Sequence, residues 1–110
     1  MQVIGGHCAS TASFVNAHHS IGMRALLLFG SEEQKTRWLP AMIRGEKLGA
    51  FALTEPEAGS DAANVQTLAT LSEDGSHYVL NGQKRYITNG AIADVLTVMA
   101  RTVVPGRAGT

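Results

Sequence analysis

The chain has 110 residues, of which 45% are hydrophobic, a size and composition that fit one small domain or parts of two domains and argue against wholesale disorder. Nine basic and nine acidic residues cancel to a formal net charge of zero, which excludes the basic footprint of a nucleic-acid-binding protein and a polybasic membrane anchor. The single cysteine, Cys8, excludes an internal disulfide and fits a reducing compartment. No signal peptide and no apolar run long enough to span a bilayer is recognisable.

Residues 1–44 are predicted to be helical, with a break at Gly30. An apolar patch runs from Met23 to Leu28 and ends at this glycine, a residue type that terminates helices. Ser31 and Gln34 then match a capping box, which predicts the start of a second helix. Gly45 is the expected end of that helix.

The second predicted helix carries an apolar face and one proline. Acidic residues in its first turn are favourable there, because the N-terminal end of the helix dipole is positive. Pro40 removes a backbone donor, so we expect it to kink or subdivide the helix. The spacing of the apolar residues predicts one face that packs on a core, formed by Trp38, Leu39, Met42 and Ile43.

From Leu48 onward the pattern changes to short apolar or alternating runs separated by turn residues, which is typical of strands. Asn81-Gly82 is interpreted as a hairpin turn between two of these runs, and Asn89-Gly90 as another reversal. The predicted strands are 48–53, 65–71 with alternate residues buried, 77–80, 84–88 and a largely buried strand at 94–104, with a turn at 72–76. Helices followed by strands predict an α+β fold, in which a helical segment leads into an antiparallel β-barrel or sandwich portion.

The segment Thr54–Asp61 places hydroxyls, carboxylates, a proline and a glycine on one loop after a predicted buried strand. Pro56 stiffens the loop, and Gly59 permits close backbone approach. By themselves these residues fit either a polar binding loop or an ordinary connection between strands, and the ordinary connection is the simpler interpretation.

The second polar segment runs from Lys84 to Gly90. Side chains alternate along a strand, so Tyr86 and Thr88 would lie on one face, where the ring could pack on a planar cofactor and the hydroxyl could bond its edge. A cross-strand aromatic pair with a threonine in the ladder is the alternative, and is favoured for this segment alone.

Together the two segments resemble the signatures of the acyl-CoA dehydrogenase family. FALTEPEAGSD at 51–61 is similar to its first signature, and NGQKRYITNGAIAD at 81–94 to its second. The resemblance covers 18–102 and implies a truncated acyl-CoA dehydrogenase fold. Residues 1–47 would be the end of the N-terminal helical domain and 48–110 an incomplete middle β domain, with the C-terminal helical domain absent.

The resemblance also implies an FAD site. Its cofactor-contacting positions correspond to Phe51, Leu53, Thr54, Gly59, Ser60, Tyr86, Ile87 and Thr88. Ser60 would also contact the acyl-CoA substrate, and Tyr86 replaces the tryptophan common at its position. Thr88 would reach the N5 region of the flavin.

The implied reaction of the intact protein is oxidation of an acyl-CoA thioester to trans-2-enoyl-CoA, as in fatty-acid β-oxidation, with hydride passing from the β carbon to flavin N5. The catalytic base would come from the missing helical domain, so this chain alone would be inactive. An electron-transferring flavoprotein would be the acceptor, in a homo-oligomer (dimer or tetramer) located in a bacterial cytoplasm or a mitochondrial matrix. Alternatives are a non-catalytic acyl-CoA-binding or assembly protein of the same fold, an acyl-CoA oxidase and a flavin monooxygenase.

Other chemically active residues are assigned no catalytic role. Glu55 and Glu57 lie in the flavin loop, where the family does not place its base. Adjacent helical positions point about 100° apart, so His18 and His19 are unsuited to one metal ion and are expected to serve surface or capping roles. No metal site is predicted.

Overall fold

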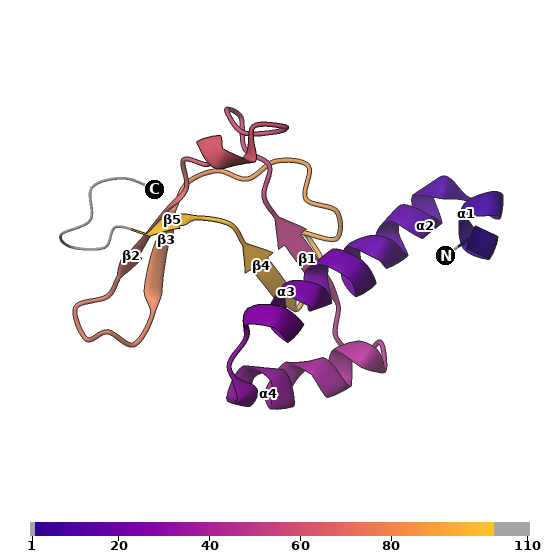
Figure 1. Cartoon of the computed structure of the whole chain (residues 1–110), viewed down its shortest axis with the longest axis horizontal. Coiled ribbons are helices and arrows are strands. Elements are labelled where there is room, and N and C mark those ends of the chain that lie inside the picture. The colour runs from indigo at the N-terminus through magenta and orange to yellow at the C-terminus, as the bar shows by residue number, and fades with distance from the viewer. Residues whose placement is uncertain (1, 103–110) are drawn as a thin grey trace. The chain divides into compact units, whose positions relative to one another are not determined.

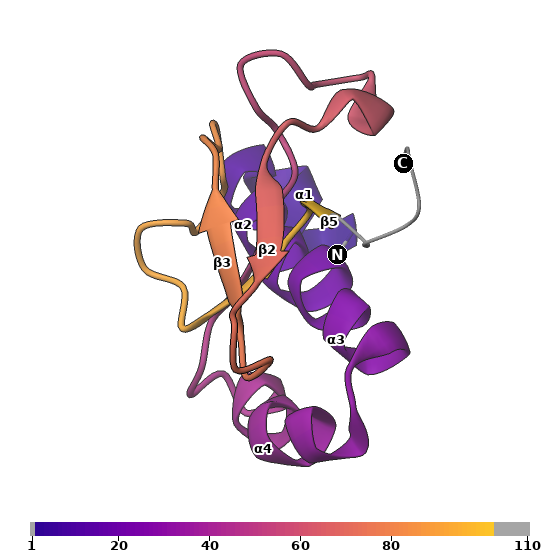
Figure 2. The same cartoon turned by 90° about the vertical axis from the view of Figure 1, so that its left-hand side faces the viewer.

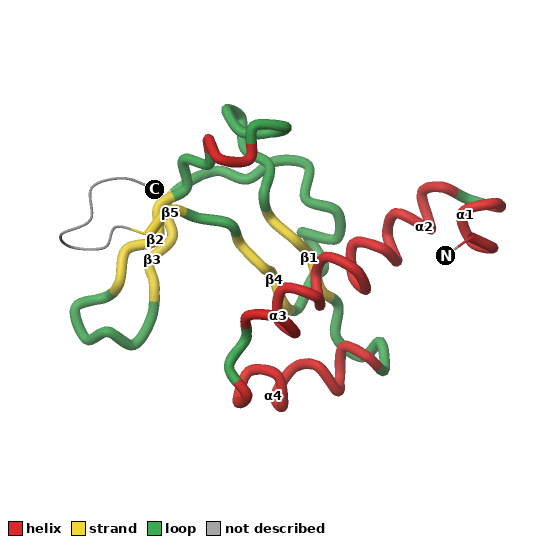
Figure 3. The backbone as a smooth tube through the Cα atoms, viewed as in Figure 1, coloured by secondary structure: helices red, strands yellow, loops and turns green. Residues whose placement is uncertain are grey.

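The computed structural model describes residues 2–102, which form an α+β fold of helices followed by short strands. These residues divide into two compact units. The first comprises 2–52 and 87–97, and the second comprises 53–86 and 98–102. Figures 1 and 3 show the elements in chain order, with long irregular stretches on either side of β2 and β3.

The first unit begins with a helical run that matches the prediction. It consists of α1 (Gln2–His7), α2 (Ala9–Asn16), the π-helical turn η1 (Ala17–Gly22) and α3 (Met23–Phe29). The run ends at Gly30, as expected. The Nδ1 atom of His18 accepts a hydrogen bond from Gly49 N at 2.9 Å, and its Nε2 lies 3.1 Å from the Met42 carbonyl oxygen. A ring that accepts at Nδ1 donates through Nε2–H. The surface or capping role expected for His18 is therefore wrong, because the half-buried ring joins three elements.

The helix α4 (Glu32–Ile43) begins at the predicted capping box. Ser31 N donates to Gln34 Oε1 at 2.8 Å, and Gln34 N donates to Ser31 Oγ at 3.2 Å. The helix ends before Gly45, whose φ of +74° suits glycine. The expected subdivision at Pro40 is wrong, because α4 runs unbroken to Ile43. A proline so near the end of the helix removes only one backbone hydrogen-bond donor. The helical hydrogen bonds continue after it, because Arg44 N donates to Pro40 O at 3.2 Å.

The predicted apolar face of α4 is only partly buried. Met42 is fully buried at 0% exposure, whereas Ile43 is 72% exposed, so the assignment of Ile43 to the core is wrong. Adjacent helical residues point about 100° apart, and Met42 is the one that faces Gly49 of the following strand.

The strand β1 (Gly49–Ala52) confirms the prediction for 48–53 and pairs with β4 (Val95–Val98) in a two-stranded sheet. Next to this sheet, the Asp94 carboxylate accepts hydrogen bonds from Leu48 N at 2.9 Å and Lys47 Nζ at 2.6 Å. The core of the first unit is small and consists of Ala17, Met23, Met42, Ala50 and Ala52.

The second unit contains the short 3-10 turn η2 (Ala62–Asn64) and a three-stranded sheet in the order β3-β2-β5. The strands β2 (Leu68–Leu71) and β3 (Tyr78–Asn81) form an antiparallel hairpin, which is clear in Figure 2, with Leu68 opposite Asn81. The short strand β5 (Arg101–Thr102) pairs with β2 in parallel, so the expectation of a purely antiparallel sheet is wrong. A closed barrel is not present within residues 2–102.

The turn at 72–76 is confirmed, but the hairpin predicted at Asn81-Gly82 is wrong. The chain reverses between β2 and β3 instead, and residues 84–88 form no strand. Gly82 has a different role, because a Cβ there would lie 2.3 Å from Thr67 Oγ1. The glycine therefore allows two segments to approach closely.

Two further strand predictions need correction. In 65–71 the alternate residues Val65, Thr67 and Ala69 are buried as expected, but Leu71 is 52% exposed at the end of the hairpin. The single strand predicted at 94–104 divides into β4 and β5, and none of its described residues, 94–102, is fully buried. Its last residues, Val103 and Val104, lie outside the described part of the chain. Within residues 2–102 no helix combines the length and the apolar character needed to cross a membrane.

Gly22 offers a test of the packing between η1 and β1. An alanine Cβ there would lie 2.8 Å from Ala17 O and 3.0 Å from the carbonyl carbon of Gly49, both backbone atoms that move only with their elements. We expect Gly22→Ala to lower the free energy of unfolding by about 1–3 kcal/mol, measured by urea denaturation. Gly6→Ala is the matched control, because a Cβ there has no neighbour within 4 Å. Equal stability of the two variants would contradict the close packing.

Candidate functional site

The loop that follows β1 is folded back on itself. Glu55 N donates to Ala58 O at 2.8 Å, and Ala58 N donates to Glu55 O at 3.3 Å, which closes a tight turn over Pro56 and Glu57. Ala58 is buried, whereas Gly59 and Ser60 are exposed. The polar loop predicted from the sequence is therefore an ordered turn that presents its later residues to solvent.

The Glu55 carboxylate is the buried anchor of this loop, with a side chain only 3% exposed. Its Oε1 atom accepts hydrogen bonds from Thr67 N at 3.1 Å and from the Thr67 hydroxyl, and its Oε2 atom accepts one from Gln66 N. These bonds fix the loop to the residues that lead into β2.

A second set of bonds connects the loop to the residues that follow β3. Lys84 Nζ donates to Glu55 Oε1 at 2.7 Å and to Leu53 O at 2.9 Å. Arg85 N donates to Thr54 O at 2.8 Å. Three consecutive residues of the first signature, 53–55, are thus bound to two consecutive residues of the second, 84–85. The two segments that the sequence singled out meet in the second unit.

The surroundings of Glu55 control its ionisation. Burial would raise the pKa of this carboxyl, but hydrogen bonds from Lys84, from Thr67 and from backbone N–H groups outweigh it and lower the pKa from 4.5 to about 2. Glu55 is therefore a carboxylate at neutral pH, with both oxygens already bonded to donors.

Tyr86 follows the anchored residues in an unusual conformation. Its φ is +55°, in the left-handed region that L residues seldom adopt, and the residue is 87% exposed. The prediction that Tyr86 and Thr88 share a strand face is wrong, because Thr88 already belongs to the turn at 88–92. The ring of Tyr86 therefore projects from an irregular, left-handed backbone position and not from a strand.

The predicted site residues fall into both units. Phe51 lies on β1 of the first unit. The same unit contains Ile87 and Thr88, where Gly90 N donates to Ile87 O at 2.9 Å and closes the turn that includes Thr88. In the second unit, hydrogen bonds bring Leu53 and Thr54 to the residues just before Tyr86. Gly59 and Ser60 also belong to the second unit and lie further along the loop. In residues 2–102, no hydrogen bond joins those two residues to 84–86.

Sequence reasoning missed the residues that hold the site together. The sequence suggests Glu55 only as a possible base, and it indicates no site role for Lys84 or Thr67. The available signal was a carboxylate next to a buried strand, which requires a partner. No local pattern identifies a partner 29 positions away along the chain.

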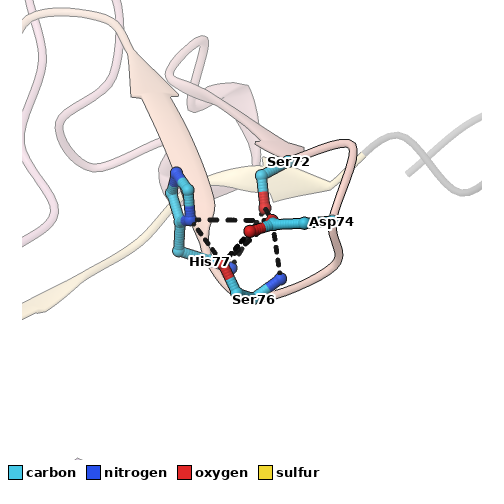
Figure 4. A network of polar contacts seen from close by, with 4 residues as sticks. All are labelled: Ser72, Asp74, Ser76 and His77. Carbon is cyan, nitrogen blue, oxygen red and sulfur yellow. Dashed lines mark hydrogen bonds and ion pairs between the residues drawn. The ribbon is translucent and has the colours of Figure 1, made fainter.

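The β2–β3 turn contains two serines, an aspartate and a histidine in contact, shown in Figure 4. Asp74 accepts hydrogen bonds from Ser72 Oγ at 2.6 Å and Ser76 Oγ at 2.8 Å, and these and the Ser76 N–H lower its pKa to about 2. In a catalytic triad the imidazole stands between the other two groups and uses a different nitrogen for each. Here Ser76 bonds Asp74 directly, and both approach Nδ1 of His77. The cluster therefore stabilises a turn.

The first unit also contains a groove of about 440 Å³ between η1, α3 and α4. Its lining is mainly apolar, and the residues are His19, Ser20, Met23, Arg24, Leu27, Leu28, Leu39 and Ile43. None of the predicted flavin contacts lies in it. Within residues 2–102, no cluster of three or more histidine, cysteine or acidic side chains is arranged to hold a metal ion.

The depressed pKa of Glu55 predicts a loss of stability in acid. The folded pKa of about 2 lies below the ordinary value of 4.5, so the carboxylate stabilises the fold fully above pH 4.5 and progressively less as the pH falls toward 2. We expect the denaturation midpoints of the wild type and Glu55→Gln to differ at pH 7 and to converge between pH 4.5 and 2. Glu57→Gln, an exposed position on the same loop that leaves Glu55 intact, is the control. A difference that does not depend on pH would contradict the assignment.

Comparison with known proteins covers nearly the whole chain. The model of the acyl-CoA dehydrogenase N-terminal domain matches residues 1–46, and that of the acyl-CoA dehydrogenase middle domain matches residues 50–110. The very long-chain specific acyl-CoA dehydrogenase of Macaca fascicularis is 46% identical over 104 residues, which are 94% of this chain and 16% of that protein. A probable acyl-CoA dehydrogenase of Bacillus subtilis is 54% identical over 85 residues, which are 77% of this chain and 14% of that protein.

A solved structure agrees. The acyl-CoA dehydrogenase of Bacillus anthracis, crystallised in complex with FAD, matches with a TM-score of 0.79 and 53% identity over 83% of this chain and 16% of that one. The chain thus spans about one sixth of the length of such relatives. Because the two domain models together match most of the sequence and the fold agrees, the chain belongs to the acyl-CoA dehydrogenase family.

Proposed function

We propose that this chain is part of a flavoenzyme that oxidises an acyl-CoA thioester to trans-2-enoyl-CoA. Residues 1–47 would close the N-terminal helical domain, and 48–110 would begin a middle β domain with a barrel or sandwich architecture. The catalytic base would come from residues outside this chain, and an electron-transferring flavoprotein would accept the electrons. The full protein would act as a homo-oligomer.

The observation that carries this proposal is the direct bonding of the two signature segments. Arg85 N bonds Thr54 O at 2.8 Å, and Lys84 Nζ bonds the residues on either side of Thr54. Residues 29 to 31 positions apart in the sequence thus belong to one local structure in the second unit. An ordinary strand connection, the simpler interpretation of either segment alone, gives no reason for such a junction.

Several groups in this part of the chain fit a planar, polar-edged cofactor such as FAD. The ring of Tyr86 is 87% exposed and available for stacking. The hydroxyl of Thr54 makes no hydrogen bond within residues 2–102, so it retains a donor and an acceptor for a ligand. Gly59 does not have a positive φ, and a Cβ added at this position would have no neighbour within 4 Å. The fold itself therefore does not require a glycine there. Close approach of a ligand would require one.

The proposed contacts divide by chemistry. Thr54 and Thr88 would bond the polar edge of the isoalloxazine ring, and Tyr86 would pack on its face. The backbone and apolar groups of Phe51, Leu53, Gly59 and Ile87 would line the cofactor, and Ser60 would contact both the cofactor and acyl-CoA. Bound FAD would supply the hydride acceptor, while these residues bind and orient it.

Glu55 is unsuited to act as the base. A general base needs a free oxygen within hydrogen-bond reach of the proton that it removes. Both oxygens of Glu55 accept hydrogen bonds inside the protein, and its pKa of about 2 makes it a weak proton acceptor. These contacts therefore argue against Glu55 as the base.

The proposed reaction can be tested with the complete gene product and with the 110-residue chain side by side. The complete protein is expected to bind FAD, and the visible absorbance of its oxidised flavin should bleach anaerobically on addition of acyl-CoA. The 110-residue chain should give no bleaching, because it lacks the base. Acyl-CoA oxidation by the short chain would contradict the assignment of the base, and a complete protein that ignores acyl-CoA would contradict the proposed function.

Gly59 gives a sharper test of cofactor approach. We expect Gly59→Ala to change the free energy of unfolding of the cofactor-free protein by no more than about 0.5 kcal/mol, because the added Cβ has open space. In the complete protein the same change should weaken FAD binding by about tenfold, equivalent to about 1.4 kcal/mol, measured by fluorescence titration. Unchanged FAD affinity would show that the cofactor does not approach this loop.

A further inference from the structure

Lys84 and Glu55 form a buried ion pair for which the proposed reaction has no use. Their side chains are 14% and 3% exposed, and the Nζ–Oε1 distance is 2.7 Å. Other ion pairs of the described residues, such as Lys47–Asp94 with side chains 43% and 33% exposed, are much more open to solvent. A buried pair of this kind adds little net stability compared with apolar residues of similar volume, because both charges lose their hydration. Stability alone is therefore a poor explanation for it.

The pair occupies a particular position between the two signature segments. Lys84 Nζ bonds Leu53 O and Glu55 Oε1, so one ammonium group holds the residues before and after Thr54. Arg85 N holds the carbonyl oxygen of Thr54 itself. Every one of these bonds uses a backbone atom of 53–54 or the side chain of Glu55, and none uses the Thr54 hydroxyl. The backbone is fixed while the hydroxyl remains available.

The same junction precedes the strained residue Tyr86. A left-handed φ in a residue other than glycine costs energy and persists only where its surroundings fix it. The two residues just before Tyr86 are those bound to 53–55. Loss of the Lys84 bonds would therefore loosen residues 53–55 and the backbone just before Tyr86, although Arg85 N, Gln66 and Thr67 still hold part of the loop.

We propose that the Lys84–Glu55 pair positions the groups that bind FAD. It holds residues 53–55 and the left-handed backbone of Tyr86 in one arrangement before the cofactor binds. This inference rests on the proposed function, and it assigns neither residue a contact with the cofactor. Preorganisation lowers the cost of ordering the loop when the ligand arrives, so the pair acts on cofactor affinity through Thr54 and Tyr86.

The test uses Lys84→Met in the complete protein. This variant removes the ammonium group that bonds Leu53 O and Glu55 Oε1. Glu55 keeps its hydrogen bonds from Gln66 and Thr67. We expect a Kd for FAD at least about tenfold higher, a shifted visible spectrum of the bound flavin, and amide hydrogen exchange of Arg85 at least about tenfold faster in the cofactor-free protein. Lys84→Arg, which keeps the charge, should restore much of the affinity. Lys47→Met, which breaks the Lys47–Asp94 pair, should change none of the three.

The outcomes are separable. A wild-type protein that does not bind FAD would overturn the proposed function and this inference with it. A wild type that binds FAD, together with a folded Lys84→Met variant of equal affinity and spectrum, would overturn this inference alone. If Lys84→Met does not fold, Lys84→Gln, which keeps a donor without the charge, is measured in the same way and decides the question by the same criteria.

Discussion

The second unit depends on the Glu55 carboxylate. One side chain collects hydrogen bonds from Gln66, Thr67 and Lys84, which lie on the approach to β2 and on the segment after β3. These segments, like the loop that carries Glu55, are irregular and have no sheet ladder to hold them. A buried carboxylate is tolerated only when its oxygens accept hydrogen bonds. Moving any donor away would leave a buried charge unpaired, and this cost holds each donor in place. The order of the loop thus follows from the cost of burying one charge.

The first unit uses a neutral group for the same purpose. The His18 ring joins η1 to Gly49 N of β1 and to the Met42 carbonyl of α4, in a core made largely of alanines and methionines. Gly22 and Gly49 let the helix and the strand approach closely enough for these bonds to form. A small core supplies little hydrophobic stabilisation, so a polar side chain that ties three elements together carries much of the specificity.

Features with a local cause could be predicted from the sequence. The capping box at Ser31, the end of α4 before Gly45 and the turn at 72–76 depend on residues within a few positions of one another. Features decided by distant partners could not. Asn81-Gly82 has the composition of a hairpin turn, but Gly82 is needed where the chain passes Thr67, and β3 had already paired with β2. The alternation that assigned Tyr86 to a strand likewise gave no sign of its left-handed φ.

The candidate site shows the same division. The residues that the family resemblance identified, such as Thr54 and Tyr86, have unused polar groups or exposed rings, as ligand-binding groups do. Those that hold them, Glu55, Lys84 and Thr67, are largely buried and are recognisable only from their contacts. The two sets alternate along the chain: Thr54 precedes Glu55, and Tyr86 follows Lys84 and Arg85. A residue can keep its side chain free for a ligand because its neighbour's side chain is committed to the fold, so motifs of this kind combine both tasks in a few positions.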